Sequence, residues 1–288
     1  MMPLFDTSYA TNMLRSRIVR FAKAWLLTPK AWDTIYSFYE MISEPLKEIL
    51  IPPESPSTLC QLRYANFGKT VLWVPREKIR YLSGVGFSEE QHHFVRYLLR
   101  GQKDLERFYR THQPKNALSR NFLTPTEPRE VRADLWSGQP WMPPPPPPPK
   151  SEFAISEVWD HHAWGPITEQ RLAKEMSRLD KIIDSIRDQG FINQPGEDFP
   201  SYQLLHDDLE TQDFRVLVAT GNHRVAALAS LGWDFIPMKP ITWAAREVFL
   251  SDLGQWPGVV DGRFTEAEAQ QIFFSFFRNF ATSLLADW

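Results

Sequence analysis

The chain has 288 residues, of which 43% are hydrophobic, so it can bury the core of one large domain or two ordinary ones. It contains no apolar run of about eighteen residues, which excludes a membrane-spanning helix. Its single cysteine, Cys60, excludes an internal disulfide and a cysteine-based metal cluster. Since the N-terminal segment also lacks the pattern of a secretory signal, we expect a cytoplasmic protein.

The net charge of −3 is divided unevenly along the chain. Residues 1–150 contain 21 basic and 14 acidic residues, whereas residues 151–288 contain 11 and 21. The two segments therefore carry +7 and −10, and we expect them to attract each other and pack together. An excess of +7 over 150 residues is modest for a nucleic-acid-binding protein, which argues against DNA binding.

The N-terminal region, residues 1–135, is predicted to be mostly helical. Residues 13–27 form a basic amphipathic helix that can lie on an anionic membrane or pack on its own domain. A second helix is predicted at Trp32–Leu50 and a further helical stretch at Ser88–Arg110, which Gly101 divides in two.

A linker rich in tryptophan and proline follows at residues 136–150. The seven consecutive residues Pro143–Pro149 adopt an extended polyproline helix, which serves as a stiff spacer or as a ligand for a proline-binding domain. We expect Trp136 and Trp141, just before this run, to anchor it to the body of the protein.

Downstream of the prolines the pattern predicts helix, strand, strand, turn, helix and strand, an α+β domain at residues 151–245. A helical extension follows at residues 246–288, beginning with a capping box at Thr265 and including a phenylalanine-rich stretch that we expect to be buried within the protein. The expected elements are a helix ending at Gly190, strands at Tyr202–Leu205 and Phe214–Ala219, a helix at His223–Leu231, and a last helix at Thr265–Leu285. A further strand is expected at Phe235–Ile241, where Pro237 and Pro240 confine it to an edge or irregular position.

The turn Gly221-Asn222-His223-Arg224, preceded by Thr220, has the parts of a phosphate-binding cradle. The unpaired N–H groups at the start of a helix attract anions, and glycine lets the backbone approach a ligand closely. Arg224 supplies a forked cationic donor, and His223 a further donor or proton carrier. An ordinary turn, with Asn222 as the N-cap and Arg224 paired to an acid such as Asp234, explains the same residues.

The surrounding sequence resembles the ParB/sulfiredoxin superfamily over roughly residues 155–241. The first matching segment is Ser185–Gly190, followed by Gln194 and Pro195. The second is Phe214–Leu228, which contains the G-x-x-R turn and continues through Leu231-Gly232 and Ile236-Pro237. The resemblance implies a small mixed sheet with helices, flanked here by helical N- and C-terminal segments.

The resemblance further implies that Gly221 and Arg224 contact the phosphates of a nucleotide, such as ATP or CTP with Mg²⁺. Members of the family hydrolyse CTP, reduce sulfinic acids or phosphorylate serine. Asn222 stands where sulfiredoxins have a cysteine and partition proteins an acid, and no DNA-binding helix-turn-helix follows Ile241. The partition and sulfiredoxin chemistries are therefore not expected, and the association with DNA remains only an alternative.

We therefore expect binding of a nucleotide or phosphorylated small molecule, with phosphoryl transfer or phosphate-ester hydrolysis as the reaction class. In that reaction Arg224 stabilises charge, His223 donates or relays a proton, and Asp184 supplies a carboxylate. The other carboxylate candidates are Asp188, Glu197 and Asp198, and each of the four acids is equally explained as a solvated surface residue. The alternative function is a non-catalytic scaffold that binds partners or a membrane surface.

The chain contains two pairs of adjacent histidines, a residue type that often binds metals. Neighbouring residues on a helix point to different faces, so His92 and His93 cannot jointly hold an ion, and we expect both at the surface. His161 and His162, together with Gln194, are predicted to lie at the rim of the phosphate site. No metal site is predicted.

Overall fold

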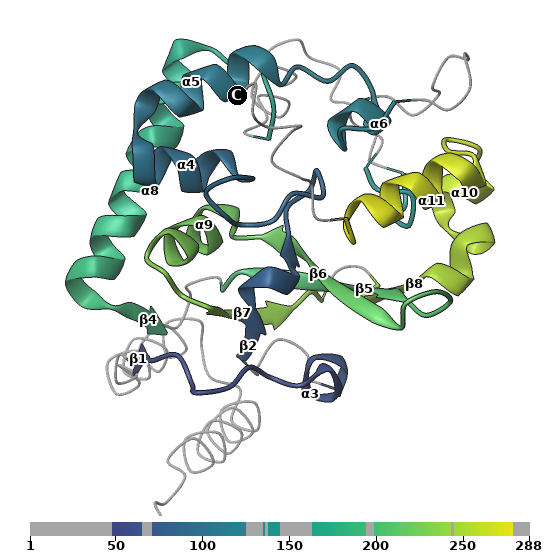
Figure 1. Ribbon diagram of the computed structural model, residues 1–288, viewed down its shortest axis with the longest axis horizontal. Helices are drawn as coiled ribbons and strands as arrows, with labels where there is room; N and C mark the ends of the chain where they lie inside the picture. The colour runs from purple at the N-terminus through teal and green to yellow at the C-terminus, as the bar shows by residue number, and fades with distance from the viewer. Residues whose placement is uncertain are drawn as a thin grey trace, which may run out of the picture. The chain divides into compact units, whose positions relative to one another are not determined.

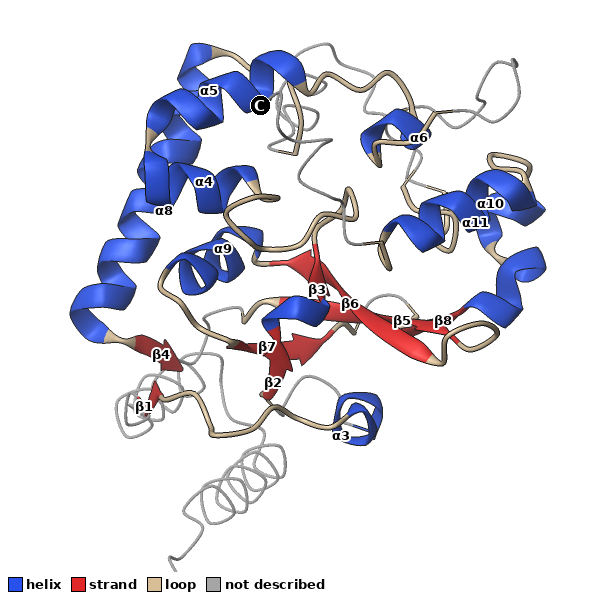
Figure 2. Cartoon of the chain, viewed as in Figure 1, coloured by secondary structure: helices blue, strands red, loops and turns tan. Residues whose placement is uncertain are grey.

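The computed structural model describes residues 48–64, 71–124, 135, 138–144, 163–193, 199–242 and 245–278 (Figures 1 and 2). The chain divides into two compact units, Met1–Glu48 and Ile49–Trp288, and nearly all described residues belong to the second. The predicted helix at residues 13–27, Trp136 and most of the proline run lie outside the described residues. Among the helices that are described, none has the length and apolar character needed to cross a membrane.

A mixed six-stranded sheet lies at the centre of the second unit, which confirms the α+β class. The strand order is β2-β7-β5-β6-β3, and β8 also pairs with β5. Neighbours β2–β7 and β5–β6 are antiparallel, whereas β3–β6, β5–β7 and β5–β8 are parallel. The strands are β2 (Leu72–Pro75), β3 (Ile79–Arg80), β5 (Ser201–Asp207), β6 (Asp213–Thr220), β7 (Phe235–Pro240) and β8 (Glu247–Phe249).

The sheet crosses the predicted domain boundary, because β2 and β3 come from the region predicted to be mostly helical. Both strands are short and put buried Val74 and Ile79 into the core, so they carry too little periodicity to be recognised. The predicted helix at Trp32–Leu50 also ends differently: Glu48–Leu50 is strand β1, which pairs with β4 (Phe191–Asn193) in a separate two-stranded sheet.

Strand β7 lies between β2 and β5, so of the two predicted alternatives, an edge or an irregular position, the edge position was wrong. Its first part, Phe235–Met238, pairs with β2, and its last two residues pair with the start of β5. Because each neighbour pairs with only part of β7, the strand accommodates Pro237 and Pro240 without an edge position.

Helices cover both faces of the sheet (Figure 2). Successive strand residues point to opposite faces, and Leu204 and Val216 belong to one core cluster while Leu205 and Leu217 belong to another. The first cluster includes residues of α4 (His93–Arg100), α5 (Gln102–Thr111), α8 (Glu169–Gln189) and α9 (Asn222–Ser230). The second includes residues of α6 (Ala117–Arg120), η2 (Leu250–Gln255), α10 (Pro257–Val260) and α11 (Glu266–Ser275).

Local signals place the helix ends largely as predicted. Gly101, with φ of +97°, separates α4 from α5, and Gly190 ends α8. The capping box at Thr265 starts α11, which ends at Ser275, before the predicted Leu285. Trp141 is buried in the second cluster, where its Nε1 donates to Gln203 Oε1 at 2.9 Å. The other short elements are α3 (Leu59–Tyr64) and η1 (Arg76–Lys78).

His92 and His93 are buried, which contradicts the expected surface position. His92 accepts a hydrogen bond from the backbone N–H of Phe94 and so caps α4, and its ring stacks on Phe87 with the centroids 4.2 Å apart. His93 stacks on Phe108 at 4.0 Å. The two imidazole rings also stack on each other with their centroids 4.8 Å apart, so both belong to the aromatic packing around the start of α4.

Candidate functional site

The turn that begins α9 depends on glycine at position 221. Gly221 has φ of +83° and ψ of 21°, in the left-handed region that side chains disfavour. A Cβ atom at this position would lie 2.7 Å from Cα of Pro200, closer than non-bonded carbon atoms approach. The chain can therefore pass directly from β6 into α9 beside Pro200 only with glycine at position 221.

Polar side chains gather at the same end of the sheet. Ser201, the first residue of β5, is paired in register with Thr220 on β6 and with Lys239 on β7. The hydroxyl oxygens of Ser201 and Thr220 are 2.8 Å apart and share a hydrogen bond. Lys239 lies with its Nζ 4.3 Å from the centroid of the Phe199 ring. Two hydroxyls and an ammonium group thus accompany the Gly221 turn.

The N-cap residue of α9 provides no side-chain cap. Gly221, and not the predicted Asn222, is the N-cap residue, and no side chain caps the helix from that position. Asn222 is the first helical residue, and its Oδ1 is buried without a hydrogen-bond donor among the described residues. Because the first amide groups of a helix lack intrahelical acceptors and carry the positive end of its dipole, this end of α9 favours an anion.

Arg224 lies in the first turn of α9 and is half-buried. The ordinary-turn explanation paired it with Asp234, but Asp234 follows the C-terminal end of the same helix. There its Oδ1 accepts from Nη2 of Arg76 at 3.2 Å. Asp234 is therefore not the partner of Arg224.

His223 is directed into the core, not toward the sheet end. Its side chain is 6% exposed, and its Nε2 lies 2.5 Å from Oε2 of Glu175 on α8. Arg171, one turn earlier on α8, contacts the other oxygen of Glu175 at 2.7 Å. The His223 ring also stacks on Phe94 at 4.6 Å. These contacts attach the first turn of α9 to α8 and α4, so His223 has a positioning role. The prediction that His223 donates or relays a proton at the turn is therefore not supported.

Glu175 was missed by the sequence reasoning although a signal was present. It lies four residues before Leu179 and four after Arg171, so helical periodicity places it on the apolar stripe of α8. A carboxylate on a buried helix face requires a charged partner. The sequence pattern therefore predicts that Glu175 pairs with a basic or imidazole side chain in the folded protein.

Asp184 lies away from the turn. Its side chain is 67% exposed and pairs with Arg187 at 3.7 Å. It follows Glu175 by nine residues, about two and a half helical turns, so it projects from the opposite side of α8. The prediction that Asp184 supplies a carboxylate at the turn is therefore not supported, and the exposed Asp188 is no better placed.

The remaining predicted site residues, His161, His162, Gln194, Glu197 and Asp198, lie outside the described residues. Within the described ranges, no group of three His, Cys, Asp or Glu side chains could hold a metal ion. No protein-family model, curated protein or solved structure matches the chain.

Proposed function

We propose that this protein binds a nucleotide or another phosphorylated small molecule at the turn Gly221–Arg224. The observation that carries the proposal is the direct entry of β6 into the N-terminus of α9 through Gly221, an N-cap residue with a left-handed backbone and no side chain of its own. The arrangement leaves amide groups, with the positive end of the helix dipole, at the edge of the sheet.

The neighbouring side chains supply the other contacts that a phosphate needs. Thr220 and Ser201 can donate from their hydroxyls, and Lys239 adds a positive charge from the adjacent strand. Arg224 adds a guanidinium, which forms paired hydrogen bonds with phosphate oxygens. Asn222, whose buried amide oxygen has no donor among the described residues, can turn its amide group toward a ligand.

The order of elements supports a ParB/sulfiredoxin-like fold as part of the proposal. Helix α8, strands β5 and β6, the turn, helix α9 and strand β7 follow each other as the resemblance implies. ATP or CTP, with Mg²⁺ bound to its phosphates, is then the expected ligand. Since His223 is buried and Asp184 faces away, the proposed activity is binding and does not include turnover.

A thermal-shift screen tests this function. The full chain is measured with ATP, CTP, GTP, UTP and phosphorylated sugars, each with and without Mg²⁺. We expect at least one phosphate ligand to raise the melting temperature of the wild-type protein and to have a much smaller effect on the Arg224→Ala variant. Arg187→Ala, which changes an exposed arginine on α8, should respond like the wild type. Equal stabilisation of Arg224→Ala, or no stabilisation by any ligand, would contradict the proposal.

A further inference from the structure

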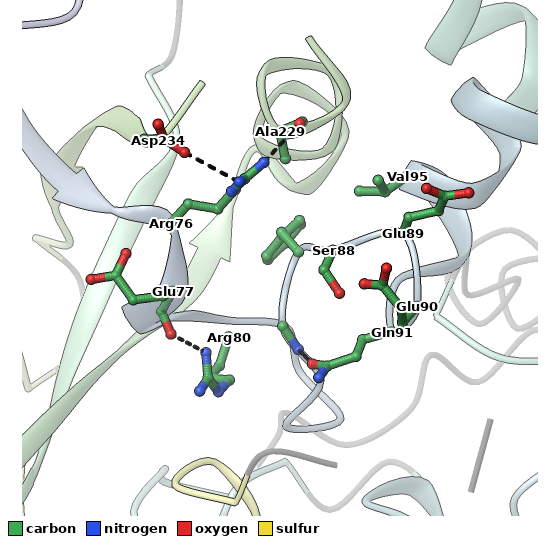
Figure 3. A pocket seen from close by; sticks show the side chains of 12 residues that line it. Arg76, Glu77, Arg80, Ser88, Glu89, Glu90, Gln91, Val95, Ala229 and Asp234 are labelled. Atoms are coloured by element: carbon green, nitrogen blue, oxygen red, sulfur yellow. Dashed lines mark hydrogen bonds and ion pairs between the residues drawn. The ribbon is translucent and has the colours of Figure 1, made fainter. Parts of the chain in front are cut away.

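A pocket of about 550 Å³ lies near the C-terminal end of α9 (Figure 3). Its lining includes Ala229, in the last turn of that helix, eight residues from Gly221. At 1.5 Å per residue the two sites are separated by roughly 12 Å of helix. The volume suits a small organic ligand. This pocket is therefore distinct from the Gly221 turn.

One wall of the pocket carries a buried positive charge. Arg80 is 4% exposed and donates to the backbone carbonyls of Phe276, Glu77 and Ile79 at 2.8, 2.6 and 2.9 Å. Within the described ranges, no carboxylate lies at ion-pair distance from it. Burial, with the charge of Arg215 as a second cause, lowers the pKa of Arg80 to about 10, so it remains protonated at neutral pH. Carbonyl oxygens solvate this charge without neutralising it.

Arg76 lies on the same wall. Its Nη1 donates to the carbonyl oxygen of Ala229 at 3.1 Å, and its Nη2 to Asp234 at 3.2 Å. Figure 3 shows the guanidinium held between these two partners, with the carboxylate of Glu77 directed away from Ser88 and Glu90. Asp234 therefore offsets the charge of Arg76, and Arg80 supplies the positive charge of this wall that has no ion pair within the described ranges.

The opposite wall is acidic and is formed by the loop before α4. Glu89 is paired with Arg100 at 2.6 Å, whereas Glu90 is exposed and has no ion pair with any described residue. The hydrogen bond from Ser88 is the main cause that lowers the pKa of Glu90, and Arg100 and Arg76 add smaller effects. Figure 3 places Glu90 and Ser88 across the pocket from Arg76 and Arg80. Glu90 therefore presents an ionised carboxylate, already hydrogen-bonded by Ser88, to a ligand in the pocket.

We propose that this pocket binds a free amino acid. Its carboxylate would contact Nη2 of Arg80, its ammonium group would contact Glu90, and its side chain would lie against Val95. A simple anion would place a like charge beside Glu90, and a simple cation would place a like charge beside Arg80. A zwitterion is the ligand class that complements both walls.

Calorimetric titration of the full chain with the common L-amino acids, one at a time, tests the proposal. The strongest binder is then compared with its methyl ester, which lacks the carboxylate, and with its N-acetyl derivative, which lacks the ammonium group. We expect each blocked derivative to bind at least about fivefold more weakly, the effect of losing a partly exposed charge pair worth about 1 kcal/mol. Failure of every amino acid to bind at millimolar concentration would overturn the proposal, as would equal binding of a blocked derivative.

Two variants distinguish binding in this pocket from a non-specific effect of the protein's charge on affinity. Glu90→Gln removes the carboxylate at an exposed position and should weaken binding by about fivefold. Asp188→Asn makes the same change of charge at an exposed position on α8 and should leave the affinity unchanged. If both variants bind as tightly as the wild type, Glu90 does not contact the ligand and the proposal fails. Arg224→Ala should also leave amino acid binding intact, because it changes only the Gly221 site.

Discussion

Acidification should destabilise the protein through the buried imidazole of His112. This side chain, in a residue that is 7% exposed, stacks on Phe122 with ring centroids 4.3 Å apart and lies 5.3 Å from Phe108. Burial lowers its pKa from 6.5 to about 4. In the unfolded chain the same group takes up a proton near pH 6.5. Because the unfolded state then binds the additional proton, stability present above pH 6.5 is lost as the pH falls toward 4.

The size of this loss follows from the two pKa values. The complete effect is about 3 kcal/mol, and about 2 kcal/mol of it is lost by pH 5. Urea unfolding followed by tryptophan fluorescence, between about pH 7 and pH 5, measures it. His112→Phe retains an aromatic ring and removes the titration. His206, whose pKa burial also lowers, titrates in both proteins, so its contribution cancels from the comparison.

The wild type should therefore lose about 2 kcal/mol more than His112→Phe over this pH range. Parallel loss of stability in the two proteins would refute the reasoning, because His112 would then titrate in the folded state as it does in the unfolded chain.

Two substitutions near the proposed binding site test its construction. Gly221→Ala should lower the free energy of unfolding by about 2–4 kcal/mol, because the new methyl group strains a positive φ and contacts the backbone of Pro200. The control Gly232→Ala has a similar φ of +82° but open space around the new methyl group, so it should lower the free energy of unfolding by only about 1 kcal/mol. Similar losses in chemical denaturation would show that the contact with Pro200 is unimportant. Glu175→Gln should lower the free energy of unfolding by about 3 kcal/mol, because it removes a buried carboxylate that lies between Arg171 and His223. The control Asp184→Asn, at an exposed position, should change the free energy of unfolding by less than about 0.5 kcal/mol. A small effect of Glu175→Gln, measured in the same way, would remove the positioning role assigned to its pair with His223.

Strong local patterns were readable from the sequence. The apolar stripe of α8, the β-branched run of β6 and the glycine between β6 and α9 predicted these elements and their order within a few residues. Each pattern arises from interactions between residues near each other in the chain, so periodicity and turn chemistry reveal it.

Long-range features were not readable. Strands β2 and β3 join the sheet through partners more than a hundred residues away, and their few residues carry no period of their own. The same holds for His223, which looked like a solvent-facing donor until Glu175 supplied a buried partner. Arg80 and Glu90, which carry opposite charges, likewise line one pocket only when the chain has folded.

The most direct test of the proposed function is the response of the backbone amides in the Gly221 turn to a nucleotide. In ¹⁵N–¹H correlation spectra of the full chain, titration with ATP or CTP and Mg²⁺ should shift the amide signals of Asn222, His223 and Arg224 in a saturable manner. The signals of Ala229 and Gly232, at the other end of α9, should move little. Saturable shifts elsewhere, with the turn amides unchanged, would contradict the assignment of the N-terminus of α9 as the phosphate site.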